Sequence, residues 1–166
     1  YDLTIEQSEP VGPDTPGHVY RFYVEATNLS DKMSAVFGND ELPLVIFTPE
    51  GIFNSIFNSS WNASGLNPAF LAVFPDLQDD SFATIGLDGP STIVPGANDP
   101  SLVQDSSLPT TVSDYFQTGG TGLNVNTETG ASWYVLNTAA NALPDEDGRW
   151  LIAQITTAGP ISGTIN

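Results

Sequence analysis

Nine residues at positions 57–65, FNSSWNASG, hold two N-glycosylation acceptor patterns around a single tryptophan. The pattern Asn-X-Ser/Thr begins at Asn58 and at Asn62, and it occurs again at Asn28. In a secreted protein this pattern accepts an N-linked glycan on a surface loop. We therefore take these three asparagines as candidate glycosylation sites. The alternative is chance, because Asn, Ser and Thr are abundant throughout the chain.

Trp61, in the middle of this stretch, is a candidate for carbohydrate binding. Small polar residues surround it, and an aromatic ring with one exposed face suits the apolar face of a sugar ring. The alternative is that Trp61 packs its loop onto the hydrophobic core. In either case the composition predicts a loop at the surface.

Acidic residues gather in short clusters, and two of these clusters could bind calcium. Asp79 and Asp80 form one pair, and Asp145 and Asp147 lie together in the other. Calcium takes about six to eight oxygen ligands, often from loops in which Asx residues and glycine let the chain curl. These four aspartates are therefore the candidate metal ligands, although the spacing of an EF-hand loop is missing. At 145–148 we favour the alternative, a solvated hairpin turn in front of a strand.

Few residues are suited to catalysis. His18 is the only histidine, so a Ser-His-Asp triad would need it as the base. No glycine-rich phosphate loop, HExxH or G-x-S-x-G motif occurs. Two carboxylates could hydrolyse a glycosidic bond without histidine, but among 20 acidic residues such a pair arises by accident. We therefore expect no enzyme, and a hydrolase is the catalytic class that stays open.

The charge balance excludes several partners. Twenty acidic residues stand against Arg21, Lys32 and Arg149, which gives a net charge of −17. Nucleic acids and anionic membrane surfaces would be repelled, because both need Lys and Arg to neutralise phosphates. No apolar run is long enough to predict membrane insertion. The absence of cysteine excludes disulfides and thiolate chemistry.

Alternating apolar and polar residues predict a series of short β-strands. Residues 2–6 place Leu3 and Ile5 on one face, and residues 18–27 continue the pattern. The same alternation recurs at 81–87, 131–136, 149–157 and 161–165. Residues 42–47 are apolar without alternation, which predicts a strand covered on both faces.

Loops and turn residues separate these strands. Residues 8–17 and 88–111 are long, irregular and rich in proline. Residues 34–37 and 70–74 fit either a strand or a short helix, and Asn67-Pro68 suits the start of a helix. The pattern predicts an all-β fold over 1–166: a single antiparallel β-sandwich or jelly-roll-like domain with at most one or two short helices.

Several segments together are similar to an uncharacterised family of β-rich modules in large secreted or surface proteins of marine and aquatic microbes. They are 20–28 with 34–44, 67–70 with 74–77 and 80–86, and 147–157 with 161–166. The resemblance implies export and placement among other domains, and it carries no established activity. We expect a processed or excised product whose chain normally continues beyond the last of these segments.

Together these observations predict an extracellular or cell-surface structural module. We expect a subunit of a filament, sheath or adhesin-like assembly, in which copies or neighbouring domains associate through β-strand edges. Calcium is the candidate cofactor, as a bridge between acidic faces. The alternative function is a calcium-dependent carbohydrate-binding module that uses Trp61, with Trp133 or Tyr134, to bind a polysaccharide.

Overall fold

A computed structural model describes residues 1–166 and contains ten β-strands and two short α-helices. The strands are β1 (Leu3–Ser8), β2 (His18–Glu25), β3 (Ala35–Gly38), β4 (Leu44–Phe47), β5 (Phe82–Ala83), β6 (Ser101–Gln104), β7 (Gly122–Val125), β8 (Ala131–Tyr134), β9 (Arg149–Thr157) and β10 (Ser162–Thr164). The α-helices are α1 (Pro68–Leu71) and α2 (Val112–Gln117). Four 3₁₀ turns complete the list: η1 (Ala63–Gly65), η2 (Pro75–Asp79), η3 (Ser91–Ile93) and η4 (Ala140–Ala142).

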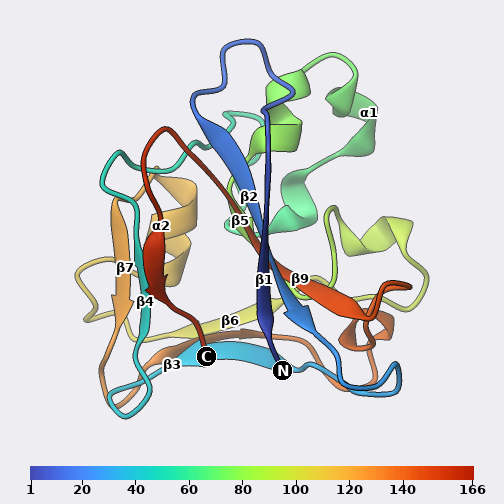
Figure 1. Ribbon diagram of the computed structural model, residues 1–166, viewed down its shortest axis with the longest axis vertical. Coiled ribbons are helices and arrows are strands. Elements are labelled where there is room, and N and C mark those ends of the chain that lie inside the picture. Colours follow the sequence, from blue (N-terminus) through green and yellow to red (C-terminus); the bar gives the residue numbers. More distant parts are fainter.

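The strands form three antiparallel sheets, and the all-β sandwich-like prediction is confirmed (Figure 1). The four-stranded sheet has the order β1-β2-β9-β5, and the other two have the orders β10-β4-β7 and β3-β8-β6. All three sheets and α2 contribute to one main hydrophobic cluster of 22 buried residues. A smaller cluster of 6 buried residues lies under the region of α1 and η2.

The strand that is covered on both faces is β9, not β4 as the apolar run at 42–47 predicted. β9 lies between β2 and β5, and its residues from Trp150 to Thr157 are all buried. In β4, Leu44 and Ile46 are buried, whereas Phe47 on the opposite face is 53% exposed. The prediction for β4 was wrong because hydrophobicity alone does not show whether a second layer covers the strand.

β1 has the predicted alternation, but its apolar face is exposed. Leu3 and Ile5 lie on the same face of the strand, yet they are 47% and 52% exposed. β1 is at the edge of its sheet and pairs only with β2. The side of β1 away from β2 therefore has no neighbouring strand.

The helices agree with the sequence only in part. Asn67 caps α1 by accepting a hydrogen bond from the Ala69 backbone N–H, with Pro68 in the first turn, so the predicted helix start is confirmed. Residues 34–37 fall largely within strand β3. Strand β6 lies inside the segment 88–111, which was predicted to be irregular. Helix α2, which follows that segment, was not predicted.

Both ends of the chain lie at the same end of the structure, near β3 (Figure 1). Neither α-helix has the length and hydropathy needed to cross a lipid bilayer.

Candidate functional site

The FNSSWNASG stretch is held together by its own asparagines. The Asn58 side chain is 8% exposed, and its Nδ2 donates to Asp80 Oδ2 at 2.7 Å and to the Asn62 carbonyl at 3.2 Å. Its Oδ1 accepts from the Ser60 backbone N–H at 2.9 Å. Asn58 therefore uses its whole amide group inside the protein.

Asn62 is used in the same way. It is 5% exposed, and its Oδ1 accepts from the Ser64 backbone N–H at 3.0 Å, which caps η1. Its Nδ2 donates to the Pro100 carbonyl at 3.3 Å. The residue thus joins its loop to the segment that leads into β6.

These contacts engage the side-chain amides of two of the three candidate glycosylation sites, Asn58 and Asn62, inside the folded protein. A glycan on the Nδ2 of Asn58 or Asn62 would break an internal hydrogen bond and would place a large polar group in a buried position. Asn28 is exposed, and its side chain makes no hydrogen bond within the protein, so it is the acceptor that stays accessible.

Trp61 packs against the main hydrophobic cluster and is partly buried. Its backbone carbonyl accepts from the Ala83 N–H at 3.1 Å, which fastens the loop to β5. Trp133, the second candidate for sugar stacking, is 1% exposed and donates its indole N–H to the Thr84 carbonyl. Trp133 is thus a core residue, whereas Trp61 packs against the cluster with part of its side chain still exposed.

The carboxylates of Asp79 and Asp80 bind two different loops. Asp79 accepts from the backbone N–H groups of Val11 and Gly12 at 2.8 and 2.7 Å. Asp80 accepts from the Ser55 N–H at 2.7 Å, in addition to the Asn58 side chain. We call this set of contacts around Asp79 and Asp80 the aspartate clasp, because it joins the loops at 8–17 and 53–62 to the strand β5.

Burial changes the acidity of Asp80. Its side chain is completely buried, and the loss of hydration raises its pKa to about 7. The hydrogen bonds from Asn58 and Ser55 act in the opposite direction because they favour the charged form. Desolvation outweighs them, so Asp80 titrates close to neutral pH.

The second acidic cluster is a turn, as we favoured from its sequence. Asp145 Oδ1 accepts from the backbone N–H groups of Asp147 and Arg149 at 3.1 and 2.9 Å, and all three aspartate and glutamate side chains of 145–147 are exposed. No group of three or more His, Cys, Asp or Glu side chains in the structure is arranged to hold a metal ion. The four predicted ligands, Asp79, Asp80, Asp145 and Asp147, are therefore not brought together in one calcium site.

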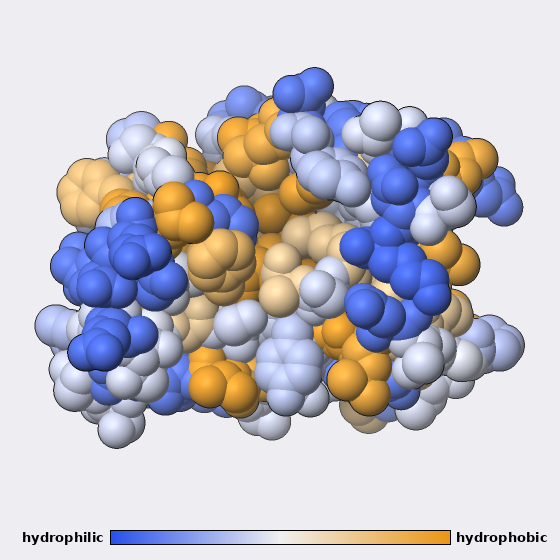
Figure 2. Space-filling model, turned by 90° about the horizontal axis from the view of Figure 1, so that it is seen from below, coloured by the Kyte–Doolittle hydropathy of each residue, from blue (hydrophilic) through white to orange (hydrophobic).

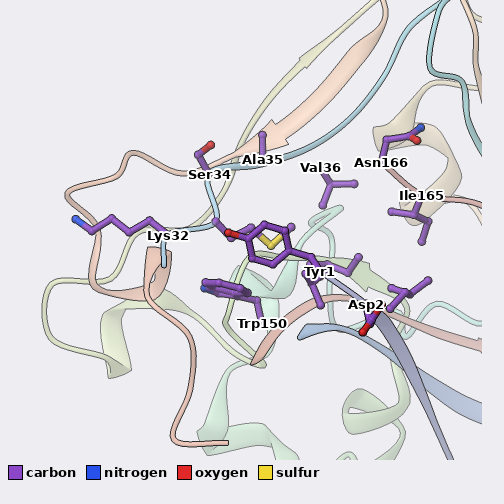
Figure 3. A pocket seen from close by; sticks show the side chains of 13 residues that line it. Tyr1, Asp2, Lys32, Ser34, Ala35, Val36, Trp150, Ile165 and Asn166 are labelled. Atoms are coloured by element: carbon purple, nitrogen blue, oxygen red, sulfur yellow. The ribbon is translucent and has the colours of Figure 1, made fainter. Parts of the chain in front are cut away.

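A surface of a different kind lies beside β1, where the structure has two apolar cavities, one of which is shown in Figure 3. One has a volume of about 370 Å³ and the other about 350 Å³. Leu3 and Ile165 line both cavities, so the two are neighbours, and we call them together the β1 groove. On the face seen from below, hydrophobic residues line the floor of a hollow that polar residues surround (Figure 2).

The β1 groove is built from sheet faces that normally form a core. Alternate residues of β1 and β2, such as Ile5 and Phe22, form one wall, and Ile161 and Ile165 on either side of β10 form the other. At the end near the termini, Tyr1 stands beside Trp150 with the ring centroids 6.4 Å apart (Figure 3). Beside the buried cluster, the apolar side chains of Leu3 and Ile5 thus stay exposed to solvent.

The backbone of β1 is also open along the groove. The Glu25 N–H donates to the Asp2 carbonyl, and Leu3 pairs in register with Val24. Since the hydrogen-bonding residues of an antiparallel strand alternate, the N–H and C=O groups of Leu3, Ile5 and Gln7 point away from β2. β10 likewise pairs only with β4.

The groove is nearly free of the charge that covers the rest of the protein. Asp2 and Lys32 are the only charged residues that line the two cavities, in a chain of net charge −17. Lys32 is exposed, and its Nζ donates to the Asn137 carbonyl. Hydrophobic contact can form here without bringing many like charges together.

Sequence reasoning expected strand edges, including those near Tyr1 and Asn166, to associate, but it did not predict the apolar depression between them, because each of its segments is an ordinary strand. The signal was present only in the alternation of residues 2–6 and 161–165, which shows one apolar face but not what covers it. Comparison with protein-family models, curated proteins and solved structures gave no match.

Proposed function

We propose that this protein is an extracellular structural module, a subunit of a filament, sheath or adhesin-like assembly. Its joint is the β1 groove, where β-strand edges of neighbouring copies or domains meet. The observation that supports the proposal is an apolar depression bounded by two edge strands, β1 and β10, each of which pairs with another strand on one side only. Unpaired edges beside exposed apolar residues are templates for association with another chain.

The electrostatics of the chain support this choice of surface. Copies with a net charge of −17 repel each other over most of their surface. The groove is the place where contact meets least repulsion, because its lining holds one acidic and one basic residue. Association should therefore strengthen as salt screens the remaining charge.

Calcium enters the proposal only as a bridge between copies. The acidic residues do not gather into a site within one molecule, but exposed carboxylates such as that of Glu146 can face those of a neighbour. Assembly that is unchanged in EDTA would remove calcium from the proposal and leave the strand-edge joint in place.

Electron microscopy and analytical ultracentrifugation of native, never-denatured protein test the proposal. We expect ordered assemblies in salt, and we expect the replacement Ile5→Thr to dissociate them, because it removes an apolar side chain from the groove but suits a β-strand. Val103→Thr is the matched control: Val103 is 54% exposed on the edge strand β6, outside the groove.

Two results would overturn the proposal. Dispersed monomers at every salt concentration would exclude assembly, and binding of these monomers to a polysaccharide would favour the alternative, carbohydrate-binding function. Assemblies that Val103→Thr dissociates as readily as Ile5→Thr would place the joint elsewhere.

A further inference from the structure

We infer that the β1 groove binds an extended polypeptide segment of defined chemistry. The segment adds to the free edge of β1 as a strand, inserts apolar side chains at alternate positions into the groove, and carries no acidic residues. This inference deepens the proposed function and rests on it for the choice of surface. It names the partner that the joint accepts.

The open backbone of β1 favours a polypeptide over a lipid or another apolar molecule. The N–H and C=O groups of Leu3, Ile5 and Gln7 point away from β2, at the free edge of the sheet. A hydrocarbon chain would cover these groups without bonding them, which costs free energy for each unpaired group. A β-strand supplies the matching donors and acceptors.

The side chains of the groove set the pattern of the segment. Leu3 and Ile5 face the cavities, and so do Tyr20 and Phe22 of the neighbouring strand. A strand paired with β1 continues this pleat, so every second side chain points into the groove. Since β1 has six residues, a segment of about six residues covers it, with about three apolar side chains inside.

Charge selects among segments that share this pattern. The cavities are nearly neutral, but the surrounding chain has a net charge of −17. Its field attracts a basic segment and repels an acidic one, mainly through the rate of association. The segment is therefore neutral or basic.

Three synthetic peptides, blocked at both ends, test the inference with the monomeric protein at low salt. The first, KVTVTVTK, alternates valine and threonine; the second, KVVVTTTK, has the same composition without alternation; the third, EVTVTVTE, replaces the lysines by glutamates. Titration calorimetry should show that the first binds at least about tenfold more tightly than either of the others. Equal affinity for the first two peptides, or no binding of the first, would overturn the inference.

A backbone variant separates strand addition from simple hydrophobic capture. Gln7→Pro removes one N–H from the open edge and leaves the ladder to β2 intact, because that N–H points away from β2. Gln7→Thr is the matched control that keeps the N–H. We expect Gln7→Pro, and not Gln7→Thr, to weaken binding of KVTVTVTK about tenfold.

The competing occupant is an apolar molecule, and laurate serves as its probe. Suppose that laurate binds Gln7→Pro and Gln7→Thr with the same affinity, and that KVTVTVTK also binds these two variants equally well. The groove is then a lipid site and the inference fails. Failure of the proposed function looks different: KVTVTVTK binds as expected, but the native protein does not assemble. If Ile5→Thr dissociates the assemblies but KVTVTVTK does not bind, the proposed function stands and this inference fails.

Discussion

The aspartate clasp and the β1 groove are built on opposite plans. Around Asp80, the side chains of Asn58 and Asn62 are almost fully buried, and each of them makes hydrogen bonds within the protein. Beside β1, apolar side chains and backbone groups stay open to solvent, as the exposure of Leu3 and Ile5 shows. The first region has the residue types of a binding site and acts as a brace, whereas the second has the residue types of a core and is free to bind.

The difference between the two regions shows what marks a site in this protein. Polar residues at short spacing bond first to each other and to nearby backbone, so their number says little about an external ligand. Apolar residues on a sheet edge without a neighbour have no internal partner to satisfy them. We therefore propose that a partner binds at the incomplete side of the fold and not at its most polar loop.

The strongest test of the brace is Asp80→Ala. This change leaves the Ser55 N–H and the Asn58 amide buried without an acceptor, so we expect a loss of about 3 kcal/mol in the free energy of unfolding. Urea unfolding at pH 6 measures it. Asp14→Ala, at an exposed position without side-chain hydrogen bonds, is the control and should stay within about 0.5 kcal/mol. A loss below about 1 kcal/mol for Asp80→Ala would show that the clasp is not a brace.

Replacing the buried Asn58 should lower the free energy of unfolding more than replacing the exposed Asn28. Asn58→Ala removes the donor to Asp80 and the acceptor of the Ser60 N–H, and we expect it to cost about 2 kcal/mol. Asn28→Ala should change the free energy of unfolding by less than about 0.5 kcal/mol. The same urea titration compares them, and similar values for the two variants would contradict the distinction between clasp and surface.

The titration of Asp80 should make the contribution of the clasp depend on pH. Its pKa is raised to about 7 by burial, whereas the unfolded chain has the ordinary value of 3.8. Between these values the folded state keeps a proton that the unfolded state has lost. The contribution of Asp80 to stability is thus fully present below the unfolded pKa and declines as pH rises through 7, by at most about 1.4 kcal/mol per pH unit.

Unfolding of the original protein and of Asp80→Ala, measured from pH 4 to 8, checks this sign. The difference in stability between the two proteins should narrow as pH rises and level off above the folded pKa. Other carboxylates titrate in both proteins and cancel in the difference. A gap that widens with pH would mean that the folded state favours the charged form of Asp80.

The groove should show the smallest effect on stability. Ile5 is already half exposed and lies on an edge strand, so Ile5→Thr removes little buried area and should cost less than about 1 kcal/mol. Its effect appears in assembly and peptide binding instead. If Ile5→Thr unfolds the protein as readily as Asn58→Ala does, the groove belongs to the core and the comparison between the two regions fails.

Much of the fold could be predicted because it depends on local pattern. The alternation in β1 and β2 and the helix start at Asn67-Pro68 depend on neighbours in sequence, and the structure confirms them. β6 and α2 were missed because turn residues around them hide short elements that tertiary contacts stabilise. Burial on both faces was predicted for β4 but is found in β9 for the same reason, since the layers above and below a strand come from distant segments.

The sequence by itself determined that this is an acidic all-β protein without cysteine, and that several strands carry one apolar face each. These properties follow from composition and from periods of two residues. Only the tertiary structure decided which polar side chains are engaged in internal hydrogen bonds. Asn58 bonds to Asp80, 22 residues further along the chain, and Asn62 bonds to Pro100, 38 residues further along. It also decided that Leu3 and Ile5 have no cover, because whether a strand has a neighbour is a property of the assembled sheets and not of the strand.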